Sequence, residues 1–346
     1  MQINNNQVRH HLFDIHPKVR KIVLVIGMAI AALILLNTFA TAQSTSDQKK
    51  KAQVSFLYPL GSNGTSTAFS HNFSYNMIIG INGGVDGFEL GGVGNVNHGE
   101  VRGFQLGGVT NYTNGKVEGV QLAGCSNVNI GPTKGFLLSV VNVVEGEMQG
   151  MQLGVVNYAK RAKGVQLGII NVMADGQEAL PIGLISVVKN GYYALETTGG
   201  ESLYANLNFK IGVETFYTIF KVGYSSFNEH SIYSYGFGVG SLIHLKDKHS
   251  LSVDLSASAI VYDDQWNKVW DDEQNILTRL DLNYRYNLTS RWSLVAGPSL
   301  NAYFTKVKVG ESFGTLNTPK TIYSSENDSR RTTMWLGFNA GMSFRF

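Results

Sequence analysis

The stretch Gly103-Phe-Gln-Leu-Gly-Gly-Val-Thr-Asn111 decides the fold of this chain, because close copies of it recur along the sequence. Further copies occupy residues 87–95, 119–127, 135–142, 150–157 and 164–171, and successive copies start 16, 16, 16, 15 and 14 residues apart. A degenerate seventh copy follows at residues 180–186, with Ser186 in place of the Asn, as is common in a terminal repeat. This regularity indicates a repeat architecture.

A period of 14 to 16 residues is too short for two helices but fits one coil of a narrow β-roll. We expect the Leu of each copy to stack in one core column and the Asn to form a second ladder, whose amides donate to and accept from neighbouring coils. The Leu column comprises Leu90, Leu106, Leu122, Leu138, Leu153 and Leu167. The Asn ladder comprises Asn95, Asn111, Asn127, Asn142, Asn157 and Asn171.

An antiparallel meander is the alternative, because one strand and a tight turn also take about 15 residues. The last three regular copies lack one residue between Leu and Asn. In a meander this deletion would move the Asn to the opposite face, whereas a coil absorbs it at a corner. The repeat is therefore interpreted as a β-roll, or solenoid, over residues 83–190.

Residues 191–346 alternate between apolar and polar side chains, as a β-strand with two different faces does. We expect strands near residues 192–198, 202–212, 214–224, 231–243, 249–262, 276–288, 290–305 and 332–346. Most have the length of a tilted membrane strand, and tight connections alternate with long ones. Together these features predict an antiparallel transmembrane β-barrel.

Residues 54–58 and 73–81 alternate as well, and we expect residues 53–82 to supply the first barrel strands. The predicted fold is all-β, with a barrel of about 8–10 strands and a Gly-rich roll. Counted as ten strands, with the C-terminus on the periplasmic side, the barrel would carry the repeat between its second and third strands on that side.

The first 42 residues are expected to form a signal peptide. An apolar run over residues 22–36 follows Lys18, Arg20 and Lys21, and Ala40-Thr41-Ala42 resembles a signal peptidase site. The mature chain would start at Gln43, with a flexible segment over residues 43–52. An uncleaved membrane anchor is the alternative, since this run is nearly long enough to span a bilayer.

Composition excludes several classes of function. The formal net charge is only +3, without a basic patch interleaved with aromatics, so nucleic acid is not an expected partner. Cys125 is the only cysteine, which excludes an internal disulfide and a site with two thiolate ligands. We expect Cys125 to be a small buried apolar residue. The glycines match no nucleotide-binding loop, and no cofactor is expected.

Candidate chemistry is sparse. Five acidic residues between 263 and 273 could bind Ca²⁺ through oxygen ligands, but their spacing favours a solvated acidic loop; they are Asp263, Asp264, Asp271, Asp272 and Glu273. Ser241, His244 and Asp247 are close in sequence but lack a nucleophile elbow. Six charges expected inside the barrel could line a pore or pair across a filled interior; they are Lys210, Lys221, Asp254, Arg279, Asp281 and Arg285.

The repeats, the opening Val54-Ser-Phe-Leu-Tyr-Pro-Leu-Gly-Ser-Asn-Gly64 and the exit Pro181-Ile-Gly-Leu-Ile-Ser-Val-Val-Lys-Asn-Gly-Tyr192 resemble a family of largely uncharacterised Gram-negative surface-repeat proteins. The end Met342-Ser-Phe-Arg-Phe346 separately resembles outer-membrane barrel ends, with Phe344 and Phe346 as the assembly signal. These resemblances imply an outer-membrane location, contact with its lipid and with the barrel-insertion machinery, and no catalytic residues.

The expected function is therefore non-enzymatic, with a structural or adhesion-like interaction role toward an unidentified protein or surface ligand. A passive transport channel is the alternative if the repeats form barrel strands. A lipid-modifying barrel enzyme is a third hypothesis.

Overall fold

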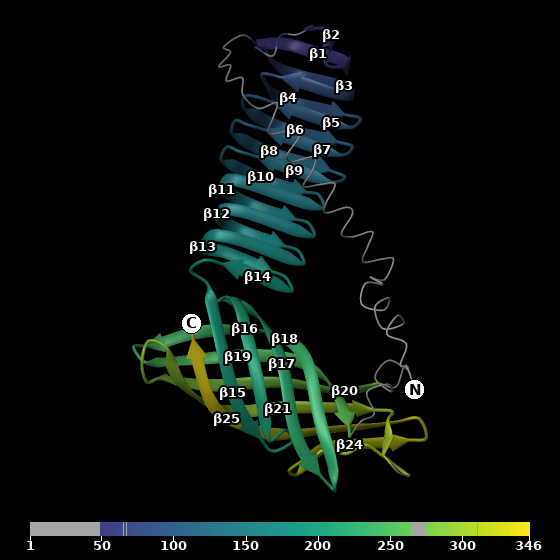
Figure 1. Ribbon diagram of the computed structural model, residues 1–346, viewed down its shortest axis with the longest axis vertical. Coiled ribbons are helices and arrows are strands. Elements are labelled where there is room, and N and C mark those ends of the chain that lie inside the picture. The colour runs from purple at the N-terminus through teal and green to yellow at the C-terminus, as the bar shows by residue number, and fades with distance from the viewer. Residues whose placement is uncertain (1–48, 65, 67, 264–273, 310) are drawn as a thin grey trace, which may run out of the picture. The chain divides into compact units, whose positions relative to one another are not determined.

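The computed structural model describes residues 49–64, 66, 68–263, 274–309 and 311–346, and the regular secondary structure of this part consists of β-strands (Figure 1). Among these residues, no helix has the length and apolar character needed to cross a membrane. The chain divides into two compact units, residues 1–146 and 147–346. The expected signal peptide over residues 1–42 lies outside the described residues.

The first unit is a β-roll of parallel strands, stacked coil upon coil (Figure 1), except that residues 60–61 pair antiparallel with the first strand. In register, Gly103 pairs with Gly119 and Asn111 pairs with Asn127, each sixteen positions along the chain. Because the neighbours are parallel, the roll is confirmed and the antiparallel meander is excluded. Its strands are β1 (Lys49–Leu57), β2 (Leu60–Gly61), β3 (Ser70–Asn82), β4 (Gly84–Gly91), β5 (Gly94–Asn97), β6 (Val101–Gly107), β7 (Thr110–Thr113), β8 (Val117–Ala123), β9 (Ser126–Asn129), β10 (Thr133–Leu138) and the start of β11 (Val141–Leu153).

Coils of the same kind open the second unit. Here β12 (Val156–Leu167) pairs in parallel with β13 (Ile170–Ile182), which in turn pairs with β14 (Ile185–Val188). The shorter period leaves the Asn in register, since Asn157 pairs with Asn171. The deletion itself falls between Leu138 and Asn142, which still pair with Leu122 and Asn127, so the coil absorbs it as the roll interpretation requires.

Residues 49–82 belong to the roll, which corrects the expectation that residues 53–82 form barrel strands. Strand β3 pairs in parallel with β1, β4 and β5. The expected flexible segment over residues 43–52 is also partly wrong, because β1 begins at Lys49. The error has a physical reason: a strand with two different faces alternates with period two in a roll as in a barrel.

The interior of the roll holds polar amides together with apolar side chains such as Val101 and Leu137, and not the expected Leu column. Gln105 and Asn111 are fully buried, whereas Leu106 keeps 38% of its surface exposed and Leu138 keeps 39%. The other four Leu of the column are partly exposed too. Cys125 is likewise only partly buried, in the outward column that contains the exposed Val109. Alternation explains the reversal, since Leu lies next to an inward Gln and must point outward.

A glycine in each coil permits this close stacking. Gly119 has φ +144°, and a Cβ added there would lie 1.9 Å from the carbonyl oxygen of Gly103. The same conformation recurs at Gly103 and Gly135. Only glycine adopts this backbone conformation without strain while a neighbouring backbone lies so close.

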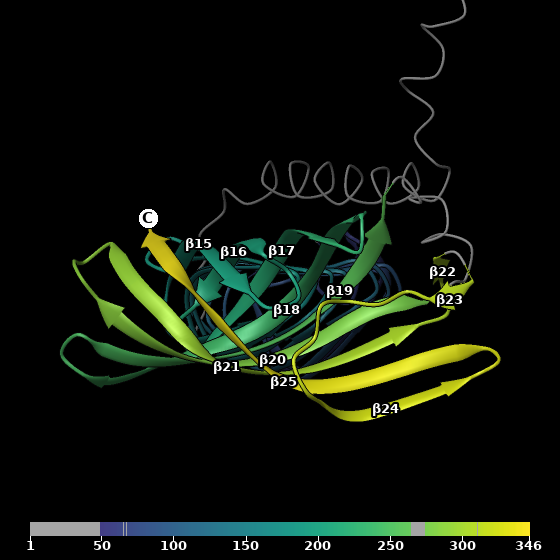
Figure 2. The same ribbon diagram turned by 90° about the horizontal axis from the view of Figure 1, so that it is seen from below.

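The rest of the second unit is an antiparallel barrel of eight strands (Figures 1 and 2). These are β15 (Tyr192–Gly200), β16 (Ala205–Val213), β17 (Phe216–Phe227), β18 (His230–Lys246), β19 (His249–Tyr262), β20 (Asn275–Asn287), β21 (Trp292–Thr305) and β25 (Arg330–Arg345). The barrel closes where β15 pairs with β25. All eight coincide with strands expected from the alternation, so the predicted all-β barrel with a roll is confirmed.

Three short strands lie in the segment expected to be a long loop. Strand β24 (Thr321–Asn327) forms a hairpin with the start of β25 outside the closed ring of strands. Strands β22 (Lys308–Val309) and β23 (Ser312–Phe313) pair only with each other. The short connections 214–215, 247–248 and 288–291 share one end of the barrel, here called the short-turn end, with Tyr192 and Phe346.

The stacking predicts a larger loss of stability at one residue of a coil than at another. Gly119→Ala should lower the free energy of unfolding by about 1–3 kcal/mol from the strained φ alone, and by more from the clash with Gly103. Leu122→Ala should cost only about 1 kcal/mol, because the Leu is partly exposed and leaves no internal cavity. Urea unfolding of the full-length protein in detergent, followed by circular dichroism, measures both. A larger loss for Leu122→Ala than for Gly119→Ala would contradict the outward Leu column.

Candidate functional site

The Asn column forms a hydrogen-bonded ladder in each of the two units. In the first unit the Asn95 side-chain amide donates to the Asn111 side-chain oxygen at 2.9 Å, and Asn111 donates to Asn127 at 2.9 Å. In the second unit Asn157 donates to Asn171 at 3.0 Å. The second N–H of each amide donates to the backbone of the next coil, as Asn95 does to the Leu106 carbonyl at 2.9 Å. Each of these buried amides therefore makes two hydrogen bonds to the next coil, one to a side chain and one to the backbone.

A column of Gln side chains runs beside the Asn ladder and ends on a buried carboxylate. Gln121 donates to Gln105, which donates to Glu89 at 2.8 Å. Glu89 also accepts from Asn76 at 3.0 Å, Asn82 at 2.6 Å and Asn97 at 2.7 Å. Burial raises the pKa of the Glu89 carboxyl, although the four amide donors, which favour its charged form, oppose this rise.

The outer surface of the roll carries the apolar columns. Phe88 stacks on Phe104 with ring centroids 5.0 Å apart and on Phe73 at 6.3 Å, each pair within 11° of parallel. Exposed Val93 and Val109 lie at the corner that joins the two strands of a coil. The roll thus carries apolar columns on its outer surface, while its buried amides share the interior with apolar side chains such as Val101 and Leu137. Large exposed apolar surfaces mark contact sites.

The barrel interior holds a buried ionic network near its middle. Lys210 Nζ lies 3.1 Å from Glu196 and 2.7 Å from Asp254, and Arg285 lies 2.5 Å from Glu196. The Tyr217 hydroxyl donates to Asp254 at 2.6 Å. Two cations and two carboxylates therefore pair across the interior.

A second group of polar contacts continues toward the opposite end. Asp281 lies 3.1 Å from Arg279 and 3.7 Å from Lys221, and it accepts a hydrogen bond from Asn339 at 3.1 Å. All six charged residues expected inside the barrel are buried there and pair with one another or with neighbours. Glu196 was missed, because it stands alone among apolar and Thr residues in the sequence of β15.

An apolar cluster fills the barrel end opposite the short turns. Trp335 is fully buried, and its indole N–H donates to Glu201 at 2.9 Å. Residues after β21 fold into this end, where Thr315 accepts a hydrogen bond from Tyr262 at 3.0 Å. The cluster comprises Leu203, Ile232, Ile260, Tyr262, Leu277, Tyr303, Val307, Leu316 and Trp335. Ionic contacts and packed side chains thus occupy successive levels of the interior.

The outer wall of the barrel is apolar. In β19, Leu255 is 50% exposed while its neighbours Asp254 and Ser256 point inward and are buried. Exposed apolar side chains recur on every strand of the barrel except β15, among them Leu207, Val222, Phe237, Leu282, Leu294, Leu300, Leu336 and Phe338. Trp292 packs against Phe344 at the short-turn end, with ring centroids 4.9 Å apart. This polarity is the reverse of that of a soluble barrel.

The final strand ends on two aromatic rings. Phe344 and Phe346 meet edge to face with centroids 5.3 Å apart, and Phe346 is 67% exposed. The Phe346 N–H donates to the Tyr193 carbonyl at 3.1 Å. Both rings therefore lie at the barrel seam, where the last strand meets the first.

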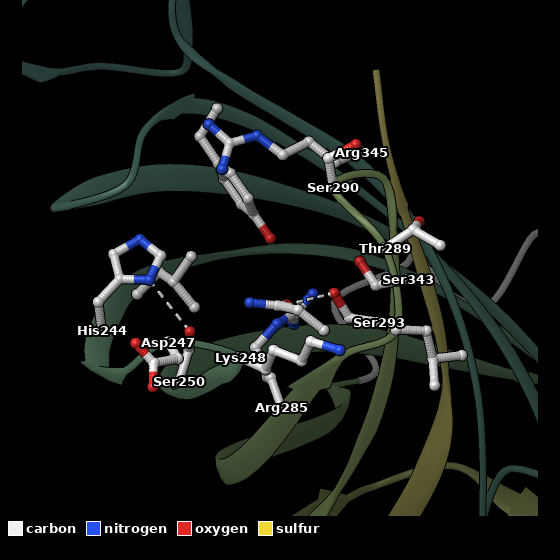
Figure 3. A pocket seen from close by; sticks show the side chains of 14 residues that line it. His244, Asp247, Lys248, Ser250, Arg285, Thr289, Ser290, Ser293, Ser343 and Arg345 are labelled. Atoms are coloured by element: carbon white, nitrogen blue, oxygen red, sulfur yellow. Dashed lines mark hydrogen bonds between the residues drawn. The ribbon is translucent and has the colours of Figure 1, made fainter.

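A pocket of about 350 Å³ opens at the short-turn end (Figure 3). His244 is hydrogen-bonded there through Nδ1 to Ser250 at 3.1 Å and through Nε2 to Glu214 at 3.0 Å. The structure thus pairs His244 with Ser250 and Glu214, and not with Ser241 and Asp247 as sequence proximity suggested. In Ser–His–acid hydrolases Nε2 faces the Ser, so this ring has the opposite orientation.

The acidic segment is described only at its first residue. Asp263 accepts hydrogen bonds from His230 at 2.7 Å and from the Ser231 N–H at 2.9 Å. Asp264, Asp271, Asp272 and Glu273 lie outside the described residues. Within the described part of the chain, no group of three or more His, Cys, Asp or Glu is arranged to hold a metal ion.

Comparison with known proteins does not identify a family for the chain. No family model and no curated protein matches the chain. Among solved structures, the crystal structure of Neisserial surface protein A is similar at 12% identity, covering 45% of this chain and 95% of that one with a TM-score of 0.27.

The buried carboxylate predicts a pH effect of known sign. Because the folded state raises the pKa of Glu89, its contribution to stability is fullest below the unfolded pKa and is lost as pH rises toward the folded pKa. Each unit of difference is equivalent to about 1.4 kcal/mol. Glu89→Gln, which places in this column the residue found at Gln105 and Gln121, should remove this loss.

Urea unfolding of wild-type protein and Glu89→Gln at pH 4 and pH 8 tests this sign. The wild type should lose more stability between the two pH values than the variant does. Glu145→Gln, a change at an exposed carboxylate of the same roll, is the control. An equal pH dependence of wild type and Glu89→Gln would contradict the assignment.

Proposed function

We propose that this protein is a non-enzymatic outer-membrane barrel that anchors a repeat roll with a structural or interaction role. The barrel serves as the anchor, and the outward apolar columns of the roll bind the partner. The observation that carries the proposal is reversed polarity: the barrel wall is apolar, while its interior holds the paired charges Lys210, Glu196, Asp254 and Arg285.

The wall supports insertion into a bilayer. Outward residues such as Leu255 and Phe338 leave apolar surface unpaired in water, which a soluble barrel avoids. The barrel has an even number of strands, eight, and its first and last strands pair to close the sheet. Its strands reach 17 residues in length, and these features fit an outer-membrane barrel. The terminal Phe346 fits the assembly signal read by the insertion machinery, and we propose that machinery and the membrane lipid as partners.

The filled interior supports an anchor in preference to a channel. An eight-stranded barrel has space for little more than its own side chains. The channel alternative required the repeats to enlarge the barrel, but they form parallel coils instead. The remaining alternative, a lipid-modifying enzyme, would use the short-turn pocket, where His244 has the orientation opposite to that of a hydrolase.

Conductance and fractionation test the proposal together. The full-length protein should resist carbonate extraction, show heat-modifiable migration and open no stable channels in a planar bilayer. Arg285→Ala would leave Glu196 with one fewer cation, and such a loss in a buried network costs about 3–5 kcal/mol. We therefore expect the heat-modifiable shift of this variant at a lower temperature, again without conductance.

Arg291→Ala, a change in a short turn, serves as the matched control and should melt as wild type does. Stable open channels from the wild-type protein would overturn the anchor role. Recovery of the protein in a soluble fraction would overturn the membrane barrel itself.

A further inference from the structure

The coils nearest the barrel in sequence present an apolar edge. Val155, Ile169 and Leu184 occupy the same corner of three successive coils, since the Ile169 N–H donates to the Val155 carbonyl and the Leu184 N–H to the Ile169 carbonyl. Their exposed fractions are 37%, 52% and 43%, and Ile185 and Val187 of β14 are exposed as well. These five residues are here called the coil edge.

Within the second unit, the last coil lies against the outer wall of the barrel. Thr218 points outward from β17 with the parity of the exposed Val222, yet it is only 3% exposed, and its hydroxyl donates to the Gly183 carbonyl at 2.7 Å. Its cross-strand partner Ile211 has the outward parity of Phe209 but is only 8% exposed.

A second contact fixes the end of the coil. The Tyr193 hydroxyl accepts from the Val188 N–H at 2.8 Å and donates to the Val188 carbonyl at 2.7 Å. Tyr193 precedes the inward Ala194 and therefore lies on the outer face of β15. Because Leu184 follows Gly183 directly, the coil edge begins at the wall. The coil edge therefore extends the apolar outer surface of the barrel.

The side of the membrane follows from the barrel alone. The chain enters at Tyr192 and ends at Phe346, both at the short-turn end. Connections there have two to four residues. At the other end residues 201–204 and 228–229 are equally short, but the long connections of the barrel, residues 263–274 and 306–329, both lie there. In bacterial outer-membrane barrels the short turns are periplasmic and the long loops extracellular. With eight strands, the coils that precede Tyr192 are on the periplasmic side.

We propose that the coil edge binds phospholipid acyl chains in the periplasmic leaflet. This inference rests on the proposed membrane barrel and extends it to the repeats. The contact seats the last coil at the level of the interfacial aromatic residues, where Trp292 and Phe346 are exposed at the same end. It gives the repeats a place inside the cell envelope.

Quenching by brominated lipids tests the contact. In a Cys125→Ser background, a bimane probe is attached to Leu184→Cys, and the full-length protein is reconstituted into phosphatidylcholine vesicles with or without bromine on the acyl chains. Lys160→Cys, an exposed polar position in the same coils, is the matched control, and Leu255→Cys on the barrel wall reports insertion. Ile169→Cys repeats the measurement if Leu184→Cys fails to show heat-modifiable folding.

The probe at residue 184 or 169 should be quenched strongly and emit at shorter wavelength, while the probe at residue 160 should be nearly unaffected. Quenching at both edge positions no greater than at residue 160, with strong quenching at residue 255, would overturn the lipid contact and leave the membrane barrel standing. Absence of quenching at residue 255 would overturn the barrel proposal, and the lipid contact with it.

Labelling of intact cells tests the side. An impermeant maleimide should label Asp328→Cys, in the hairpin at the opposite end, on intact cells. It should label Lys160→Cys only after the outer membrane is permeabilised. The reverse pattern, with residue 160 labelled on intact cells, would overturn the periplasmic placement.

Discussion

The buried carboxamide ladder is the interaction on which the roll depends. An amide sealed from water must find both donors and acceptors, and an unsatisfied one costs about 1–3 kcal/mol. Asn111 meets this demand by accepting from Asn95 and donating to Asn127 and to the Leu122 carbonyl. These bonds require neighbouring coils at one β-sheet spacing, so any coil that is out of register breaks several of them at once.

The ladder also accounts for the apolar exterior. Once Gln and Asn take the inward positions of a coil, alternation sends Phe104 and Leu106 outward. The apolar columns of such a roll face water unless lipid, a partner or another copy of the chain covers them. The barrel follows the same logic on a larger scale, with Lys210 and Glu196 inside and Leu255 outside.

Periodicity predicted the architecture well because it reflects geometry directly. The 16-residue spacing gave the parallel coil, and the alternation in residues 250–262 gave β19 nearly to the residue. The prediction was wrong where a hydrophobic side chain was assumed to be buried. Leu106 was expected in the core, but it is partly exposed and its neighbour Gln105 is buried. Gln105 and Asn111 are six positions apart, and in one continuous strand this even spacing would place both on the same face. The corner between β6 and β7 lies between them, so alternation alone could not show that both point inward. Interior partners such as Glu196 with Arg285, 89 residues apart, depend on barrel closure, which local pattern does not encode.

Hydrogen exchange of the side-chain amides tests the central claim most directly. Carboxamide protons of Asn111 and Gln121 should exchange far more slowly with deuterium than those of Gln149, which lies exposed on the same roll. Selectively ¹⁵N-labelled Asn and Gln in the full-length protein, observed by NMR, would report all three. Slow exchange confined to the inward columns is the predicted result. Exchange of Asn111 and Gln121 as fast as that of Gln149 would contradict a polar ladder at the centre of the roll.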